Sequence, residues 1–213
     1  MNIKIKISVR RVAKGKLKKA RFYADFRVSQ SPILYHMERR IFMNQVMEAL
    51  LNRRSIRAFE EKPIPREEIE QIVEAGRYAP SGMGRQTWKF TVVVNREKIQ
   101  KLAAAIEKVL GRENYNMYAP EVLIIPSNDR TSKFGKEDNA CALENIFLAA
   151  YSFGIGSVWI NQLQDICDDP QIRAILDEFE IPADHVVYGM AALGYPAMDP
   201  KQPNKIGKVH FVE

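Results

Sequence analysis

Residues 137–160 read EDNACALENIFLAAYSFGIGSVWI, and this stretch sets the centre of the fold. Residues 137–154 are long enough for a helix and carry small or apolar side chains on nearly every face, so we expect a helix buried on several sides. Gly154 ends it. The β-branched and aromatic residues that follow predict a core strand over 156–162. A helix of this kind commonly also serves a subunit interface.

Helices and strands continue outward from this centre in both directions. Apolar residues at helical spacing, together with Pro, Asn and Gly at the helix ends, predict helices over 43–52, 66–76, 96–111 and 170–179. Runs of β-branched and aromatic residues predict further strands over 88–95, 121–127 and 185–196. Helices come first and strands then alternate with helices, which indicates an α+β or α/β sandwich.

The composition is that of a globular protein. A chain of 213 residues is enough for one sizeable core and fits one domain better than two. It contains no run of eighteen apolar residues and no start typical of a secretory signal, so we expect neither a membrane span nor secretion. Cys141 and Cys167 form no CxxC pair, which favours reduced thiols in a cytoplasmic protein.

The net charge of +6 is unevenly distributed. Residues 1–42 hold twelve of the 32 basic and two of the 26 acidic residues, a net charge of +10. The 20 basic and 24 acidic residues that remain give residues 43–213 a net charge of −4. We therefore expect a basic N-terminal extension, disordered or not native, over residues 1–42, and one mildly acidic domain over residues 43–213.

Three interpretations of the extension stay open. It can be a basic arm for nucleic acid or acidic lipid, a targeting presequence, or translated upstream sequence with the start at Met37 or Met43. The third is favoured, because the residues after Met43 begin like the first helix of a compact domain. The extension therefore carries little information about function, and we expect no nucleic-acid partner.

Several common catalytic and metal-binding motifs are absent from the sequence. It has no GxSxG, HExxH, CxxC or GxxxxGK[ST], and its three histidines are scattered, so we expect no metal site. GIGSVW at 154–159 begins like a dinucleotide fingerprint, but Trp159 replaces the third glycine and the segment ends a helix. Such a chain can still be an enzyme if a bound cofactor carries the chemistry.

Residues 53–59, RRSIRAF, are the first sign of a cofactor site. Arginine offers a rigid fork of donors that matches a phosphate, and serine adds a neutral donor. Arg53, Arg54, Ser55 and Arg57 could therefore hold a phosphate and another electron-rich group. An exposed basic loop is the alternative that these residues alone leave open.

A second and a third segment have the same character. In APSGMGRQTWKF at 79–90, Pro80, Ser81 and Gly82 make a turn with little side-chain bulk, which lets backbone amides approach a flat ligand. Gln86 then leads into a core strand. GIGSVWINQ at 154–162 is another glycine turn that leads into a strand. Each segment alone is most often just a turn.

Together, and in this order, RRSIRAF, APS…Q.W.F, CALENIFLAAYSFGIGSVWI and the closing ALGYP resemble the nitroreductase family of FMN-dependent NAD(P)H oxidoreductases over about residues 43–213. The resemblance implies a three-layer α/β/α sandwich with a mainly antiparallel central sheet, and an entwined homodimer with FMN at its interface. It also implies NADH or NADPH as electron donor and a ping-pong reaction with a nitroaromatic, quinone or similar small oxidised acceptor. The alternative is a flavin-binding protein or a specialised member, dehalogenase-like or flavin-remodelling.

The resemblance also assigns site residues. Arg53, Arg54 and Ser55 would hold the ribityl phosphate, and Arg57 would support charge at the pyrimidine edge of the flavin, with no catalytic protein group. Pro80, Ser81 and Gly82 would approach from the partner subunit, and one of two lysines would complete the phosphate site. The cofactor-binding set is Arg53, Arg54, Ser55, Arg57, Pro80, Ser81, Gly82, Gln86, Trp159, Ile160, Asn161, Lys205 and Lys208.

The sequence departs from the family pattern at three points. Gly84 stands where an asparagine is common and Thr87 where a proline is common, which should loosen the turn beside the site. The C-terminal segment offers lysines where an arginine is common. The stretch between residues 96 and 136 is too short for the long helical excursion of larger members, so we expect a more open site.

Overall fold

The computed structural model describes residues 44–200 and 202–213, so the expected extension over 1–42 lies outside the described residues. The helices are α2 Gln45–Asn52, α3 Arg66–Arg77, α4 Arg96–Leu110, α5 Gly135–Ser152 and α6 Pro170–Glu178, with a short 3-10 helix η1 over Gly82–Gly84. The strands are β1 Trp88–Val93, β2 Val122–Asp129, β3 Gly156–Ile160, β4 His185–Val186 and β5 Met190–Gly194. Each predicted helix is confirmed within about two residues at its ends.

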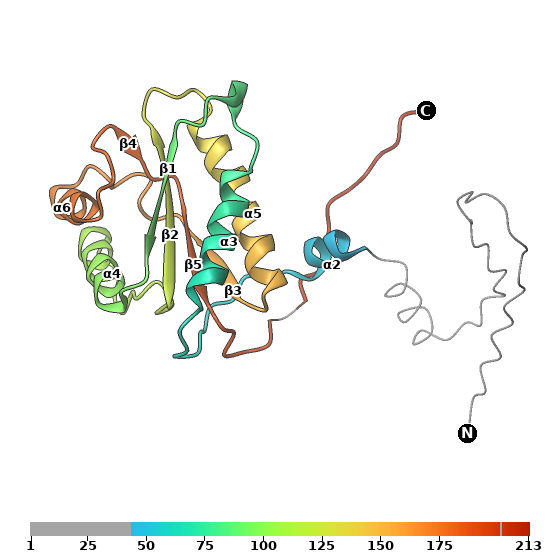
Figure 1. Ribbon diagram of the computed structural model, residues 1–213, viewed down its shortest axis with the longest axis horizontal. Helices are drawn as coiled ribbons and strands as arrows, with labels where there is room; N and C mark the ends of the chain where they lie inside the picture. The colour runs from blue at the N-terminus through green and yellow to red at the C-terminus, as the bar shows by residue number, and fades with distance from the viewer. Residues whose placement is uncertain (1–43, 201) are drawn as a thin grey trace, which may run out of the picture. The chain divides into compact units, whose positions relative to one another are not determined.

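The strands form one antiparallel sheet in the order β1-β2-β5-β3, with β4 paired to the end of β2. Figure 1 shows this sheet nearly edge-on, with α4 and α6 on one side and α3 and α5 on the other. The chain is therefore a three-layer sandwich of mixed helix and antiparallel sheet, and the expected fold class is confirmed.

The last strand differs from its prediction. The single strand expected over 185–196 is two, because β4 pairs only with the end of β2 while β5 pairs with both β2 and β3. Gly189 lies in the break, where a Cβ would stand 2.5 Å from Nε1 of Trp159. The indole thus occupies the space that a side chain at this position would need.

Each face of the sheet has its own hydrophobic core. On one face, α4 contributes Ile99, Leu102 and Ile106. On the other, Leu143 and Ile146 of α5 pack with residues of α3. The predicted burial of α5 on several sides is confirmed, since it contacts α2, α3, β2, β3 and β5. Even so, no helix in residues 44–200 or 202–213 is long and apolar enough to cross a membrane.

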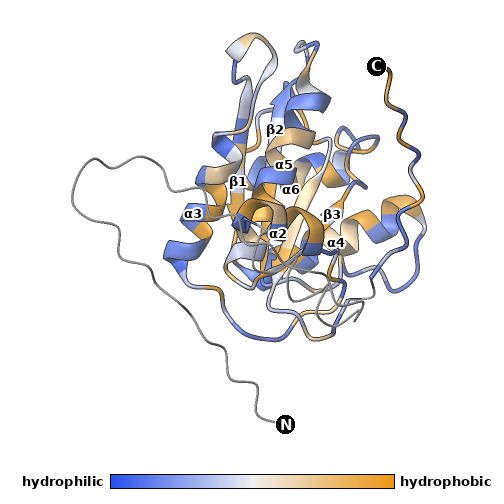
Figure 2. Ribbon diagram, turned by 90° about the vertical axis from the view of Figure 1, so that its right-hand side faces the viewer, coloured by the Kyte–Doolittle hydropathy of each residue, from blue (hydrophilic) through white to orange (hydrophobic). Residues whose placement is uncertain are grey.

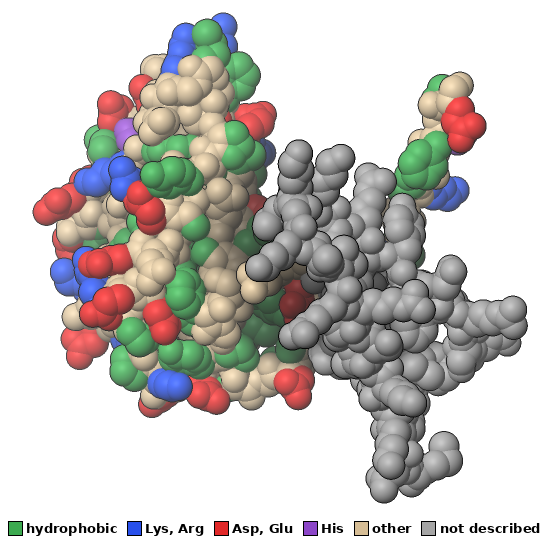
Figure 3. Space-filling model, turned by 45° about the vertical axis from the view of Figure 1, so that its right-hand side comes forward, with side chains coloured by type: hydrophobic (Ala, Val, Ile, Leu, Met, Phe, Trp, Pro, Cys, Tyr) green, Lys and Arg blue, Asp and Glu red, His purple; other side chains and the backbone are tan. Residues whose placement is uncertain are grey.

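Two segments expose apolar side chains. Helix α2 buries none of its residues, and it leaves Val46 67% and Leu51 47% exposed; Figure 2 colours most of this helix hydrophobic. The segment 202–213 has no regular structure and leaves Ile206 and Phe211 more than four-fifths exposed. Figure 3 shows hydrophobic side chains at the end of this segment standing clear of the rest of the described chain.

A glycine-to-alanine substitution in α3 tests the packing of the helix layer. A Cβ at Gly76 would lie 2.9 Å from Cγ1 of Ile146 and 3.2 Å from the ring of Phe90. Alanine is favoured over glycine inside a helix by about 1 kcal/mol, but overpacking costs about 1–3 kcal/mol. We expect Gly76→Ala to lower the free energy of unfolding in a denaturant titration. The exposed Gln71→Ala should change it by less than about 0.5 kcal/mol, and a more stable Gly76→Ala variant would contradict this packing.

Candidate flavin and anion site

The basic loop after α2 is anchored to the edge of the sheet. Ser55 forms a parallel bridge with Ser157 of β3, and the Ile56 N–H donates to the Ser157 carbonyl at 2.9 Å. Ile56 is 5% exposed and packs against Gly156, where a Cβ would lie 2.7 Å from its Cγ1. Since Ile56 points inward, Ser55 and Arg57 on either side of it are exposed.

A cavity of about 400 Å³ lies over this loop. Its walls are Arg54, Ser55, Ile56 and Arg57 on one side and Met198, Pro200 and Pro203 of the C-terminal segment on the other. Arg54 joins the two sides, because its Nη2 donates to Oε1 of Gln202 while its Nη1 donates to the Arg53 carbonyl at 2.6 Å. The volume falls within the range of small-molecule sites in proteins.

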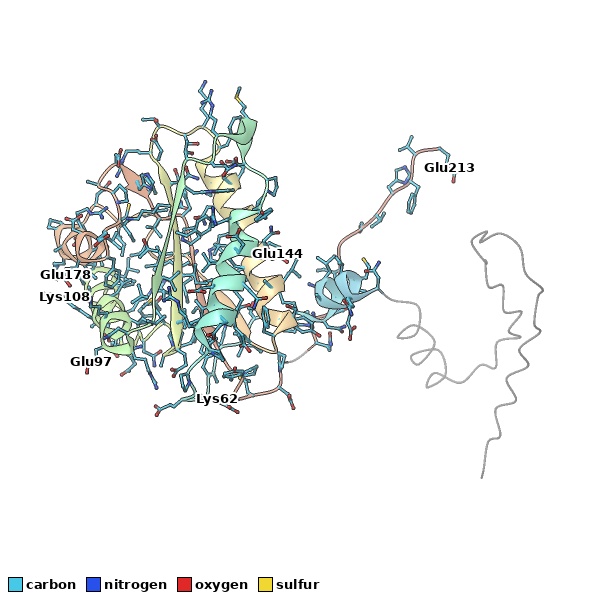
Figure 4. The ribbon with its side chains drawn as sticks, in the orientation of Figure 1. Lys62, Glu97, Lys108, Glu144, Glu178 and Glu213 are labelled. Atoms are coloured by element: carbon cyan, nitrogen blue, oxygen red, sulfur yellow. The ribbon has the colours of Figure 1, made fainter. Side chains whose placement is uncertain are left out.

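The guanidinium groups in this loop are incompletely satisfied. Nε of Arg53 and Nε of Arg54 are both buried and have no hydrogen-bond partner within the described part of the chain. The nearest carboxylate to Nε of Arg53 is that of Glu144, whose Oε1 lies 3.6 Å away, an ion-pair distance longer than a hydrogen bond. The Arg53 guanidinium also lies over the ring of Phe147, with 5.7 Å between its carbon and the ring centre. Figure 4 labels Glu144, which projects from α5 on the side of α2. Buried donors without partners are unusual, so this cluster is suited to an anion.

Strand β3 brings an aromatic side chain to the same place. Trp159 is 39% exposed, and its ring centre lies 6.2 Å from that of Phe147. The Arg53 guanidinium lies over the same Phe147 ring. Asn161 follows β3 and is exposed. Ile160 differs from the expectation, because the whole residue is only 2% exposed and its side chain belongs to the core.

The turn over residues 80–86 is held by side chains from elsewhere. The Gly82 N–H donates to Oδ1 of Asp138 at 2.7 Å, and the Gln86 N–H donates to Oγ of Ser81 at 3.1 Å. The amides of Gly82 and Gln86 are therefore already bonded within the chain, and the assignment of these residues to a cofactor stays a prediction. Pro80 is exposed and has no amide hydrogen.

Thr87 does not loosen the end of this turn. Its hydroxyl donates to Oδ1 of Asn128 at 2.6 Å, and its carbonyl accepts from the Asp129 N–H at 3.1 Å. Threonine therefore ties the turn to β2 through a side-chain bond that a proline could not make. Gly84, with φ of 65°, supplies a left-handed backbone that an L side chain rarely adopts.

The expected site residues fall into two separate groups. In the first group, Arg54, Ser55 and Arg57 line the cavity, and Arg53 and Trp159 lie beside Phe147. In the second group, Pro80, Ser81, Gly82 and Gln86 belong to the turn that is held to the first turn of α5. Asp138 and Phe147, which mark the two places on α5, are nine residues apart, about 13 Å along a helix axis. Lys205 and Lys208 are exposed in the C-terminal segment. One chain does not bring the two groups together.

Sequence reasoning missed the residues that support both groups. Glu144, Phe147 and Gln202 contact the arginines, and Asp138 holds the turn. Asp138 could have been noticed in the sequence, because it is a charged residue in a helix expected to be buried on several sides. In the structure it is 4% exposed. No pattern in the sequence pointed to Gln202.

Comparison with known proteins identifies the family. The model of the nitroreductase family matches residues 50–195. The chain therefore belongs to the nitroreductase family.

Individual relatives agree with this assignment. A crystal structure of a nitroreductase with bound FMN from Bacteroides fragilis has 40% sequence identity and a TM-score of 0.75, covering 80% of this chain and all of that one. A protein of Methanothermobacter thermautotrophicus, with the provisional name NADH dehydrogenase/NAD(P)H nitroreductase, is 32% identical over 79% of this chain and 86% of its own. An NADPH-flavin oxidoreductase of Vibrio harveyi is 30% identical over 75% of this chain and 69% of its own.

The arginine donors without hydrogen-bond partners lead to a prediction about the stability of the ligand-free protein. If Arg54 serves a ligand more than the fold, Arg54→Met should leave the free energy of unfolding of the ligand-free protein within about 0.5 kcal/mol of the unsubstituted chain. Arg96→Met is the matched control, since Arg96 contacts the buried Glu121 at 3.0 Å.

That control should cost about 1–3 kcal/mol, because it leaves a buried carboxylate without its cation. The measurement is denaturant unfolding of both variants after dialysis to remove bound ligand. If Arg54→Met destabilised the protein as much as Arg96→Met, the arginine cluster would be structural.

Proposed function

We propose that this chain is an FMN-dependent oxidoreductase that takes a hydride from NADH or NADPH and passes electrons to a nitroaromatic, quinone or similar oxidised acceptor. The observation that carries the proposal is the cavity lined by Arg54, Ser55 and Arg57, beside two buried arginine Nε groups that lack a hydrogen-bond partner in the described chain. An anionic, flat cofactor would satisfy these donors. Family membership and the FMN in the Bacteroides fragilis nitroreductase support the same ligand.

The phosphate end of the cofactor would lie toward Arg53, Arg54 and Ser55. The charge-assisted hydrogen bonds of two guanidinium groups suit a phosphate dianion better than any neutral ligand. The contact between Arg54 and Gln202 keeps the C-terminal segment beside the cavity, so Lys205 or Lys208 could complete the neutralisation. Glu144 would then act as a counter-charge that limits repulsion among the arginines.

The ring end would lie toward Arg57 and Trp159. FMN, when bound, would supply the hydride-accepting and electron-donating chemistry. Arg57 is exposed, lines the cavity and forms no ion pair in the part of the chain that the structure describes, so its charge is available to stabilise negative charge on a ligand. Trp159 and Asn161 would flank the ring through their exposed side chains, whereas the buried Ile160 would support the strand that presents them.

A second copy of the chain would complete the site. The exposed apolar residues of α2 and of the segment 202–213 support a homodimer, since patches of this kind mark interaction surfaces. They also support the entwined form, because the C-terminal segment buries little against its own chain. In such a dimer, Pro80, Ser81 and Gly82 of one subunit would face the arginine group of the other, with FMN between them.

The two substrates would use one position in turn. The exposed groups around the cavity provide charge and shape but no acid–base pair, so positioning and electrostatics would govern both steps. A nicotinamide that leaves before the acceptor enters gives a ping-pong reaction.

Loss of flavin from a double variant tests the cofactor assignment. Arg54→Met with Ser55→Ala should weaken FMN binding at least a hundredfold, because each hydrogen bond to a charged group contributes about 1.5–3 kcal/mol and 1.4 kcal/mol is a factor of ten. The affinity follows from fluorescence titration of flavin-free protein. Arg77→Met, which removes an exposed arginine paired with Glu74, is the control and should bind FMN normally. An unchanged affinity in the double variant would refute the assigned phosphate site.

Anaerobic mixing with each nicotinamide tests the activity. We expect NADH or NADPH to bleach the visible absorbance of the bound flavin, and a quinone or nitroaromatic added afterwards to restore it. Steady-state rates at several fixed acceptor concentrations should give parallel double-reciprocal lines. If neither donor reduced the bound flavin, the chain would be a flavin-binding protein or a specialised family member, as the alternative holds.

A further inference from the structure

Asp138 is a buried carboxylate that the proposed function leaves without a role. It lies in the first turn of α5 and is 4% exposed, and it takes part in no ion pair with a described lysine or arginine. The positive end of the helix dipole favours a negative charge in this turn. The partner it does have is the Gly82 N–H, 56 residues away in sequence, at 2.7 Å.

Gly82 is held on two sides by the start of α5. Its amide hydrogen points to Asp138, and its Cα lies against the ring of Phe134, where a Cβ would stand 2.3 Å from Cδ2. The backbone of Phe134 is held, since its carbonyl accepts from the Asp138 N–H at 2.8 Å, and the residue is 40% exposed. Gly82 is therefore held to the start of α5 by its hydrogen bond to Asp138 and by its packing against the Phe134 ring.

The turn needs such a support because its backbone is strained. Met83 has φ of 57° and Gln86 has φ of 49°, values that residues with side chains rarely adopt. Each residue in such a conformation costs about 1–3 kcal/mol, which the surrounding structure must offset. The bond from Gly82 to Asp138 holds the N-terminal side of the turn, as the Thr87 hydroxyl holds its C-terminal side.

We infer that Asp138 is a positioning residue for the flavin site, which it serves by holding the turn over residues 80–86 in the shape that the ligand meets. The inference rests on the proposed function, because that turn is the part of the site expected from the partner subunit. The side chain acts as a hydrogen-bond acceptor, so its oxygen matters and its charge does not. Without it, the strained turn relaxes and presents Pro80 and Ser81 in the wrong place.

The first measurement is made on flavin-free protein. Hydrogen exchange of the Gly82 amide, followed by NMR, should be at least tenfold faster in Asp138→Ala than in the unsubstituted chain. Asp138→Asn keeps an acceptor oxygen and should stay within about threefold. Glu137→Ala removes an exposed acid from the same helix turn and should change nothing. Equal protection of Gly82 in all variants would overturn the inference.

The second measurement is FMN affinity at a temperature where every variant is folded by circular dichroism. We expect the Kd to rise about tenfold to a hundredfold in Asp138→Ala, the range expected when a donor inside the protein loses its acceptor. In Asp138→Asn the Kd should stay within about threefold of that of the unsubstituted chain. This variant is the one to measure if Asp138→Ala does not fold. A purely structural role would lower the melting temperature of Asp138→Ala and leave the Kd unchanged, which would overturn the inference.

These measurements distinguish a failure of the proposed function from a failure of the inference about Asp138. If the unsubstituted chain binds no FMN, the proposed function fails and the inference fails with it. If it binds FMN and Asp138→Ala binds equally well, the inference alone fails. A loss in Asp138→Asn as large as that in Asp138→Ala would also overturn it, because the acceptor oxygen would then not be what counts.

Discussion

The hydrogen bond from the Ile56 N–H to the Ser157 carbonyl is the contact on which the rest of the site depends. It attaches the basic loop to the edge of the sheet, and the packing of Ile56 on Gly156 fixes which way the loop faces. Ser55 and Arg57 must then point outward, toward the cavity. Because β3 is the strand so attached, Trp159 comes to the same place. This arrangement requires glycine at position 156, because a Cβ there would collide with Ile56.

In the described chain the sandwich is well packed, but α2 and the C-terminal segment are poorly covered. The two cores are closed by helices on both faces of the sheet, whereas α2 and the C-terminal segment leave large apolar side chains in solvent. The two groups of site residues are likewise separate, one near Phe147 and one near Asp138. A second copy would resolve both features at once, since the same association would cover the apolar residues and join the groups. We therefore regard dimer formation and cofactor binding as one event in this account.

Much of the fold could be predicted from the sequence, because its signals are local. Asn95 and Asp169 cap their helices with the bonds that their residue types suggest, and Gly111 ends α4 in a left-handed conformation. The break in the last strand could not be predicted, because it involves the contact of Gly189 with Trp159, a residue distant in sequence. Basic and glycine-rich motifs marked the site. Alternation along β3 places Ile160 with Val158 on the core side, opposite to Trp159, but the resemblance assigned the consecutive residues Trp159, Ile160 and Asn161 to the flavin together. Gln202 depends on a tertiary contact with Arg54 that no spacing rule describes.

The most direct test is a mixed dimer with complementary defects. One tagged chain carries Arg54→Met with Ser55→Ala, and the other carries Gly82→Val, whose side chain would collide with Phe134. Neither variant alone should bind FMN well. If each site takes its arginines from one subunit and its turn from the other, the purified mixed dimer should regain one intact site and bind one FMN with normal affinity. A mixed dimer that binds no more FMN than its parents would contradict the account, because a site built within one chain is damaged in both.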